Sequence, residues 1–426
     1  MPEKKDPRVS PRSPVAQPPT PRIEAGGSPW SDGLVLEDTE FALELLRRLI
    51  RENSTDDEGG VIAVLEAACT EGSLVSRRVP SVGGHENLLI GLCESDLELA
   101  ARGACHERLI FNCHMDTSPV GALTTWSVDP FGGDIEGANV FGRGASDAKG
   151  GLAAMLTAMR TVKRVRGDAS GLTLTAVSQE TAGNVGTRDL VGKGLRGAGA
   201  IVGEHTMGVS MAVAYRGVIW AQLEISGRSA HPGRPDQAVD AIELMVNEFI
   251  PALRRHAWDE APHPMLPEPH LTVTEIRGGH SMAMIADHAV ATIDMRTLPA
   301  QSVTSVFATL GEICAAVAAG HPESTVSFRK LYSVDGFESP RDSRVSQLLE
   351  MAIHEISGHE ATKIGKVGMC DGNVLANHAD IPTVIFGPGN PSGMGPDEYC
   401  NISALRSATA VLQSVGERWV SGQNAA

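Results

Sequence analysis

The sequence predicts an α/β fold, in which a catalytic domain with a mainly parallel central sheet and flanking helices carries an inserted α+β domain. Two observations predict this fold. Short apolar runs alternate with segments of helical periodicity along most of the chain. The alternation stops near residue 213, where strand-like segments dominate for roughly a hundred residues, the size of a small domain, and it resumes near residue 335. The 426 residues are enough for two or three domains.

The first part of the sequence predicts a tail and then the first segment of the catalytic domain. Residues 1–33 are rich in Pro, Ser and charged residues, have almost nothing to bury, and are expected to be disordered. Residues 34–212 carry the alternating pattern. The expected elements are a helix at 36–53, strands at 87–93 and 108–113, a helix at 150–165, and strands at 171–179 and 199–204.

The second part predicts the inserted domain, over residues 213–334, and then the rest of the catalytic domain, over residues 335–421. Residues 212–227 alternate in the manner of one half-buried antiparallel strand. The other expected elements are a helix at 236–256, strands at 270–279 and 289–299, helices at 302–320 and 344–357, and a strand within 381–389.

Composition excludes several classes of partner. The formal net charge of -16 argues against a nucleic-acid backbone as partner, because such binding needs Lys and Arg to displace counterions. Seven scattered cysteines without a CxxC pair are typical of a reduced, cytoplasmic protein. No apolar run approaches the ~18 residues of a membrane span, and the N-terminus lacks the apolar core of a signal peptide. We therefore expect neither nucleic acid nor membrane as a partner.

Polar residues cluster where predicted strands end. His114 and Asp116 end one strand, Glu180 and Glu204 end two others, and Asp147 lies in a glycine-rich turn before a helix. In open α/β sheets the ligand crevice lies beyond the carboxyl ends of the strands. Each residue alone has a plainer interpretation: Asp147 as a helix cap, the glutamates as solvated strand ends, His114 as a satisfied polar residue. Together they indicate a site.

The residue types indicate a metal centre. One imidazole and several carboxylates suit Zn²⁺, Mn²⁺ or Co²⁺ without thiolate ligands. His114 and Asp116 are two residues apart and therefore point the same way along a strand. The Asp116 carboxylate is expected to accept a hydrogen bond from the ring nitrogen of His114 that faces away from the metal. Glu180 is the predicted general base for a water molecule.

These segments resemble a known family. The motifs "HMDTSPVG", "FGRGASDAKGGLAAML", "GNVGTRDLV", "GEHT", "SAHPGRPDQAVDAI" and "DMRTLP" are similar to those of the co-catalytic zinc amidohydrolases, such as glutamate carboxypeptidase, aminoacylase, acetylornithine deacetylase and succinyl-diaminopimelate desuccinylase. The resemblance runs from about residue 38 to about residue 420. It implies a catalytic domain with two zinc ions, an inserted lid that often mediates dimerisation, and cleavage of amide bonds in N-acyl amino acids or small peptides.

The resemblance also implies roles for single residues. His114 and Glu204 match two ligands of one zinc ion, and Asp147 matches the carboxylate that bridges both ions. Asp116 matches the partner of the ligand histidine, and Glu180 matches the general base.

Two lid residues match as well. His231 resembles a lid histidine that polarises the scissile carbonyl group. Arg296 resembles a lid arginine that binds a substrate carboxylate, although a salt bridge within the lid is the alternative.

The sequence departs from the family pattern at the second zinc ion. Thr181 stands where the family has an acid, and Met394, in the turn-rich loop at 387–400, stands where it has a histidine. A hydroxyl and a thioether are poor ligands for a borderline dication, and losing both should cost far more than the ~10–100-fold in affinity of a supporting residue. We therefore expect a single ion, zinc with Mn or Co as alternatives, on His114, Asp147 and Glu204.

Further departures leave alternatives open. Ala283 replaces an asparagine that helps to hold substrate. His205 replaces a proline and is either a new ligand or a solvent-facing loop residue. His378, Cys370 and Asp371 are other possible replacement ligands, although Cys370 is expected to be a packing residue without a general base beside it.

Three functions fit these observations. The first is an amide hydrolase with one metal ion, acting as a cytoplasmic homodimer on a small, carboxylate-bearing amide. The second is a repurposed enzyme that uses Glu180 for proton transfer, elimination, cyclisation or acyl transfer with little or no metal. The third is a binding protein without turnover, which would have no need of the retained base.

Overall fold

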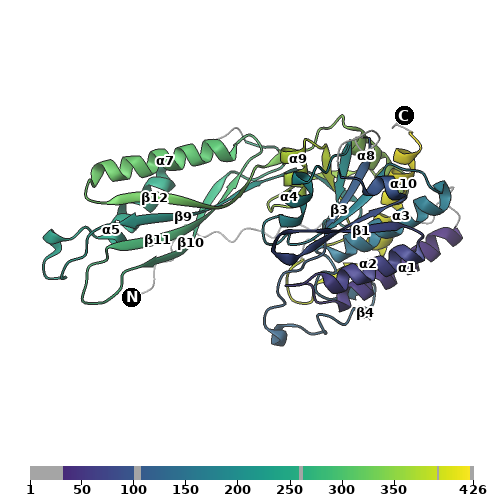
Figure 1. The fold of residues 1–426 in the computed structure, drawn as a ribbon, viewed down its shortest axis with the longest axis horizontal. Helices are drawn as coiled ribbons and strands as arrows, with labels where there is room; N and C mark the ends of the chain where they lie inside the picture. Colours follow the sequence, from purple (N-terminus) through teal and green to yellow (C-terminus); the bar gives the residue numbers. More distant parts are fainter. Residues whose placement is uncertain (1–31, 100–106, 259–261, 391–392, 423–426) are drawn as a thin grey trace, which may run out of the picture.

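The computed structural model describes residues 32–99, 107–258, 262–390 and 393–422 (Figure 1). The tail expected over 1–33 therefore lies outside the described residues except for its last two, where the first helix, α1 (Asp32–Arg51), begins. Among the described residues there are two large sheets, which lie side by side along the longest axis of the molecule in Figure 1.

The larger sheet has nine strands in the order β1-β2-β6-β3-β7-β15-β8-β13, with β14 also paired to β8. Its centre, from β6 to β15, is parallel, which confirms the α/β prediction. On one flank β2 pairs antiparallel with both β1 and β6. On the other flank β8 pairs antiparallel with β15 and β13 and parallel with β14. The strands are β1 (Val75–Pro80), β2 (Glu86–Gly91), β3 (Leu109–His114), β6 (Leu172–Val177), β7 (Gly199–Val202), β8 (Ser210–Tyr215), β13 (Phe337–Glu338), β14 (Thr362–Lys366) and β15 (Thr383–Ile385).

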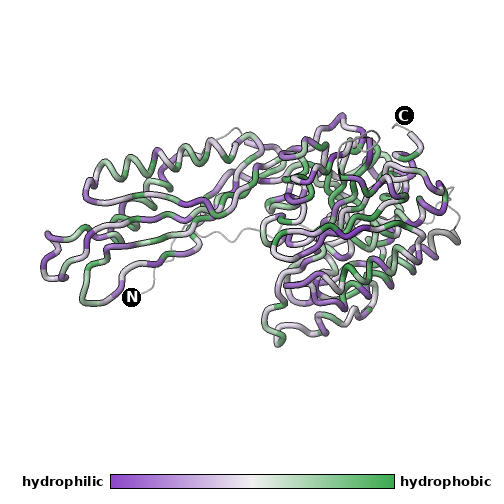
Figure 2. The backbone as a smooth tube through the Cα atoms, viewed as in Figure 1, coloured by the Kyte–Doolittle hydropathy of each residue, from purple (hydrophilic) through white to green (hydrophobic). Residues whose placement is uncertain are grey.

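Helices cover both faces of this sheet, since its strands are buried on both sides. One apolar core lies under five helices, α1, α2 (Gly59–Glu71), α3 (Lys149–Arg166), α8 (Arg344–Ser357) and α10 (Ile402–Val420). A second core lies under α4 (Val185–Gly192) and α9 (Asp371–Ala379). In α1, Leu45, Leu46 and Leu49 are buried at helical spacing, while Arg48 and Arg51 remain accessible. Figure 2 shows where apolar residues, in green, and hydrophilic residues, in purple, follow one another along the backbone.

The smaller sheet has the order β10-β11-β9-β12, all antiparallel. Its strands are β9 (Gly217–Ser226), β10 (His270–Gly278), β11 (His288–Thr297) and β12 (Thr325–Val334). Inward-facing residues of β9 and β11 form an apolar core with a helical segment at 241–255 and with α7 (Val303–Gly320). The 241–255 segment consists of α5 (Ala241–Leu244), a π-helical turn (Met245–Phe249) and α6 (Ile250–Arg255).

The strand predicted at 212–227 is in fact two strands. β8 belongs to the larger sheet and β9 to the smaller one, so the chain passes between the sheets at Arg216. A Cβ atom on Gly217 would lie 2.2 Å from the Thr297 hydroxyl oxygen, so only glycine fits this crossing.

Two other predictions need correction. The helix expected at 236–256 begins only after Asp240, whose carboxylate caps the backbone N–H groups of Ile242 and Glu243. The 18-residue helix α7 reaches the length and apolar composition of a membrane span, contrary to the prediction. One side of α7 packs into the core of the smaller sheet, as a core helix does.

Short elements complete the described fold. A three-stranded sheet joins β4 (Ile135–Glu136), β5 (Asn139–Phe141) and β16 (Tyr399–Asn401), and so brings the glycine-rich turn before α3 beside the loop before α10. Single 3₁₀ turns lie at Val82–Gly84, Glu94–Leu97, Leu123–Thr125 and Pro235–Gln237.

Candidate metal centre

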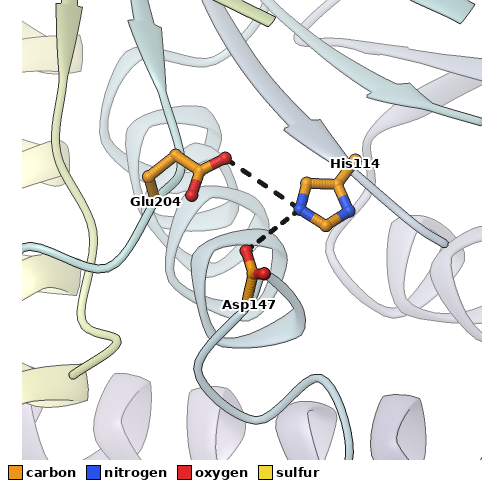
Figure 3. A group of neighbouring side chains, drawn as sticks. All are labelled: His114, Asp147 and Glu204. Carbon is orange, nitrogen blue, oxygen red and sulfur yellow. Dashed lines mark hydrogen bonds and ion pairs between the residues drawn. The ribbon is translucent and has the colours of Figure 1, made fainter. Parts of the chain in front are cut away.

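Three predicted ligands meet at the carboxyl ends of the central parallel strands. His114 is the last residue of β3, Glu204 follows the neighbouring strand β7 by two residues, and Asp147 precedes α3. One donor atom from each residue lies within 4.8 Å of the other two. Figure 3 shows the three side chains pointing toward one another.

The distances between these atoms suit a small dication. The Nε2 atom of His114 lies 3.3 Å from Oδ1 of Asp147 and 4.0 Å from Oε1 of Glu204. Atoms that are each about 2.0–2.2 Å from a zinc ion can be at most about 4.4 Å apart. All three side chains are at most 10% exposed, so two carboxylates lie together away from water. A cation would offset their mutual repulsion.

The orientation of the His114 ring is fixed by Asp116. Nδ1 of His114 lies 2.9 Å from the backbone carbonyl oxygen of Asp116 and 3.6 Å from its carboxylate. The sequence predicted that the Asp116 carboxylate would accept this hydrogen bond, whereas in the structure the Asp116 backbone carbonyl accepts it. A carbonyl can only accept, so Nδ1 carries the hydrogen and the neutral ring presents a lone pair on Nε2.

Acidic neighbours favour positive charge at this place. Burial opposes protonation of His114, but its hydrogen bonds to Asp116 and Asp147 and their charges outweigh burial and raise its pKa. The same carboxylates would favour a metal ion, which competes with the proton for Nε2.

The Asp116 carboxylate organises the turn that carries the predicted base. It accepts hydrogen bonds from the backbone N–H groups of Glu180, at 2.9 Å, and Thr181, at 3.0 Å. It also accepts one from the Thr181 hydroxyl at 2.6 Å. Burial raises the pKa of Asp116, but the nearby His114 ring and the hydrogen bonds from Thr181 and from the Glu180 N–H outweigh burial and bring the pKa to about 2. Asp116 is therefore a fixed anion that joins the candidate ligand His114 to the predicted base Glu180.

Glu180 is buried beside a second carboxyl group. Its Oε1 accepts from the side-chain amide of Asn184 at 3.2 Å, and the same amide donates to Asp371 at 3.2 Å. Burial and the charges of Asp371 and Glu204 outweigh the charge of His114 and raise the pKa of Glu180. A raised pKa suits a group that must take up a proton near neutral pH.

Asn184 was missed by the sequence interpretation. It has a left-handed backbone with φ of 58°, is fully buried, and its side-chain oxygen accepts from the Tyr332 hydroxyl at 2.6 Å. Tyr332 belongs to β12 of the smaller sheet. The base is thus connected to the smaller sheet by two hydrogen bonds. The sequence did offer one signal for this role, because Asn184 lies only four residues after the predicted base Glu180.

Glu398 was missed as well, and it explains the loop at 387–400. Its Oε1 accepts from the backbone N–H groups of Ser146 and Asp147, each at 2.9 Å. Its Oε2 pairs with the buried Arg143 at 2.6 Å. The neighbouring Asp397 accepts from Ser127. This loop therefore places Glu398 so that it holds the backbone of Asp147, while Asp397 holds Ser127.

The residues expected at a second ion do not fit one. The Thr181 hydroxyl hydrogen is donated to Asp116, and Met394 is 55% exposed on a turn with φ of 72°. Neither position supplies a charged or imidazole donor. The cluster of the described residues that can hold an ion contains only the ligands of the first site.

The structure does not bring His231 to this centre within one chain. β9 has ten residues, and at about 3.3 Å per residue it spans roughly 30 Å. His231 lies beyond the end of β9 that is remote from the larger sheet, is exposed, and accepts from the Gly233 N–H at 3.0 Å. Ala283 lies in an exposed turn of the same domain.

Arg296 lies near the other end of the smaller sheet, on β11. Its guanidinium forms two hydrogen bonds to Asp294, at 2.7 and 2.9 Å, and Asp294 also accepts from Trp220 at 2.7 Å. This is the salt bridge given above as the alternative to carboxylate binding.

The other candidate residues lie in different surroundings. His205 is next to the cluster, with Nδ1 3.2 Å from Oε2 of Glu204. Cys370 is fully buried before α9, and burial raises its pKa well above the ordinary value, which leaves it an inert thiol. Asp371 belongs to the Asn184 network, whereas His378 is exposed near the end of α9.

Comparison with known proteins identifies the family. A model described as peptidase family M20/M25/M40 matches residues 110–418. A succinyl-diaminopimelate desuccinylase of Parvibaculum lavamentivorans is 27% identical over 395 residues, which are 90% of this chain and 96% of that protein. An acetylornithine deacetylase of Proteus mirabilis is 26% identical over 404 residues, 90% of this chain and 98% of that protein.

A solved structure shows the same fold. The crystal structure of the aminopeptidase PepT of Bacillus cereus superposes with a TM-score of 0.72 at 21% identity, and the match covers 90% of this chain and 99% of that one. The segment matched by the family model begins in β3 and ends in α10, so it contains every ligand of the candidate centre. This chain therefore belongs to the M20/M25/M40 peptidase family and is a hydrolase of C–N amide bonds.

Proposed function

We propose that the protein hydrolyses the amide bond of an N-acyl amino acid or small peptide-like substrate with one metal ion per chain. His114, Asp147 and Glu204 would hold the ion, zinc in the first place with manganese or cobalt as alternatives. The observation that carries the proposal is this buried three-donor cluster beside Glu180, whose pKa is raised. Three protein ligands with an open position make a workable catalytic zinc site.

The residues of the chain divide the chemistry among them. When bound, the ion would supply Lewis-acid polarisation of the scissile carbonyl and lower the pKa of water. Glu180 takes the proton of the attacking water and returns it to the leaving amine. Asp116 keeps the Glu180 turn in place through the two backbone hydrogen bonds described above.

We assign the smaller sheet as the lid and dimerisation domain, within residues 213–334. His231 then reaches a catalytic centre from a second copy or by closure of the lid, and there it stabilises the developing oxyanion. Arg296 binds a substrate carboxylate only by exchanging its bond to Asp294. Exposed apolar side chains on this domain support a homodimer, namely Ile242, Val246, Ile276, Met282 and Met284.

A reduced, cytoplasmic location is part of the proposal. The six described cysteines are all free, and five are buried. Burial raises the pKa of Cys69 to about 12 and that of Cys400 to about 12, so these thiols behave as packing residues.

A substrate panel with a base variant tests the proposed function. N-acyl amino acids and dipeptides are incubated with the metal-loaded protein and with Glu180→Gln. Release of free amine should fall about 10²–10⁴-fold in the variant, the typical contribution of a general base, while bound metal stays constant. Equal activity of both proteins would contradict the role of Glu180, and no released amine on any substrate would contradict hydrolysis.

One observation favours a second candidate, a repurposed enzyme that does not hydrolyse. Two ligand positions of the family's second ion are lost together, at Thr181 and Met394, whereas Glu180 is kept. Hydrolysis in ¹⁸O-water places ¹⁸O in the product acid. Elimination, cyclisation or transfer to another acceptor changes the substrate without it, and a binding protein leaves the substrate intact.

A further inference from the structure

A histidine outside the family's ligand set lies against the candidate metal centre. His205 directly follows Glu204, and its Nδ1 lies 3.2 Å from Oε2 of Glu204 and 3.9 Å from Oδ1 of Asp147. The two Glu204 oxygens are divided between the histidines, because Oε1 is the one that faces Nε2 of His114. Asp147 offers the same oxygen to both rings.

The His205 nitrogen has no hydrogen-bond partner within the described part of the chain. Nδ1 is buried, yet its closeness to Glu204 does not give a hydrogen bond of acceptable geometry. A buried polar atom without a partner destabilises the folded chain. A cation between the imidazole nitrogen and the carboxylate oxygens would satisfy all of them at once.

Contacts on two sides fix the position of the His205 backbone beside the candidate centre. The Nζ atom of Lys366, on β14, donates to the His205 carbonyl oxygen at 2.8 Å. On another side, a Cβ atom on Gly389 would lie 2.9 Å from Cβ of His205 and 2.3 Å from the Ser146 carbonyl oxygen. The glycine loop therefore packs closely against His205, and no side chain at residue 389 could separate the two.

We propose that His205 is a fourth protein ligand of the single metal ion, coordinating through Nδ1. This inference rests on the proposed one-ion centre and explains how that centre retains its ion without a neighbour. Two imidazoles and two carboxylates would then hold the ion. Water or substrate would take a fifth position, a coordination number that zinc can reach during catalysis. Cobalt and manganese take such oxygen- and nitrogen-rich sites as well.

The test is metal binding, which needs no substrate. Zinc affinity is measured by competition with a chromophoric chelator, and the ligand field is read from the visible absorption of the Co²⁺-loaded protein. In His205→Ala the zinc affinity should fall by more than about 100-fold, because even a residue that only orients a ligand contributes about 10–100-fold. The cobalt bands should shift in the same variant, since one imidazole is lost.

His359→Ala is the matched control, because His359 is exposed in the turn between α8 and β14. It should leave both the affinity and the spectrum unchanged. His205→Ala with wild-type affinity and an unshifted spectrum would mean that His205 forms only an ion pair with Glu204, and the proposal would be overturned.

A second measurement covers the case in which His205→Ala does not fold. The wild-type chain labelled with ¹⁵N-histidine is titrated with zinc, and the ring nitrogens are followed by NMR. Nδ1 of His205 should move to a metal-bound shift together with Nε2 of His114, and a His205 signal that does not respond contradicts the proposal.

Failure of this inference and failure of the proposed function are distinguishable. If zinc binding depends on His205 but the protein releases amine from no substrate, the ligand assignment stands and the proposed hydrolase function is contradicted. If His205→Ala binds one ion and keeps full hydrolytic activity, the proposed function stands and the ligand assignment is contradicted.

Discussion

The two sides of the metal centre differ in how the chain uses them. On the side of His114, Asp147 and Glu204, the three side chains are at most 10% exposed, and the backbone carbonyl of Asp116 holds the His114 ring. On the side of Thr181 and Met394, one side chain donates its hydroxyl hydrogen to Asp116 and the other faces solvent. The residues of the first side are placed to hold a cation. On the second side, Thr181 supports them through its hydrogen bond to Asp116.

The turn-rich loop at 387–400 supports the candidate centre through Glu398 and not through Met394. Met394 supplies no ligand, but Glu398, four residues later, fixes the backbone N–H groups of Ser146 and Asp147. The loop therefore contributes to the candidate cluster even though Met394 offers no charged or imidazole donor. The same holds for Thr181, whose hydrogen bond orients the Asp116 carboxylate.

The largest expected effect is on the side that holds the ion. Asp147→Asn removes the charge that both His114 and His205 approach, so the affinity for zinc should fall by well over 100-fold, beyond the effect of a supporting residue. Elemental analysis after gel filtration should then find almost no bound metal. Asp342→Asn, at an exposed position, serves as the control. Wild-type metal content in Asp147→Asn would contradict the role of Asp147 as a ligand.

Removing the charge of Glu398 should cost about 3–5 kcal/mol of unfolding free energy, because it leaves the buried Arg143 without its ion pair. Urea unfolding measures this cost. The control is Glu323→Gln, which breaks the exposed pair with Arg228 and should cost less than about 1 kcal/mol. Equal destabilisation by Glu398→Gln and Glu323→Gln would show that the loop does not support the site.

Placing charged and imidazole donors at residues 181 and 394 should create a second metal site. The double variant Thr181→Glu with Met394→His should raise bound metal above one ion per chain. Each single variant should add little, because one new donor does not complete a site. The gain is limited by the loss of the Thr181–Asp116 hydrogen bond, which contributes about 0.5–1.5 kcal/mol. Isothermal titration with zinc checks the number of sites, and an unchanged number contradicts our alignment of these positions.

The smallest effect concerns the connection between the base and the lid. Asn184→Ala removes a hydrogen bond to the Glu180 carboxylate, so the pKa of Glu180 should rise further. The base acts when deprotonated, and activity is lost as pH falls through this pKa. The acidic limb of kcat/KM should therefore move to higher pH. Tyr332→Phe, which removes the hydrogen bond that the Tyr332 hydroxyl donates to Asn184, should move the limb in the same direction by less. An unmoved limb in both variants would exclude the coupling.

The fold was predictable where the information is local. The helices α1, α3, α7 and α8 follow from the spacing of their apolar residues, and the strands around the site follow from short apolar runs. The crossing at Arg216 was not predictable, because Gly217 is required by Thr297, 80 residues further along the chain. Strand β12 was not predicted either, since it is an edge strand with Arg329 and Lys330 in its middle.

The three residues of the candidate metal cluster were predictable as a group for a similar reason. Each follows a recognisable strand or glycine-rich turn, and parallel strands bring such residues to one edge of a sheet. The supporting residues were not, because Asn184 and Glu398 act through hydrogen bonds to Asp371 and Asp147, which are remote in sequence. The role of His205 depends on which way its ring turns, and its neighbours in sequence do not determine that.

Metal stoichiometry tests the one-ion centre most directly. The full chain is purified without chelator, saturated with zinc, freed of excess ion, and analysed for zinc and protein together. We expect one zinc ion per chain in the wild type. Two ions per chain, with a donor that the positions of Thr181 and Met394 do not supply, would contradict it.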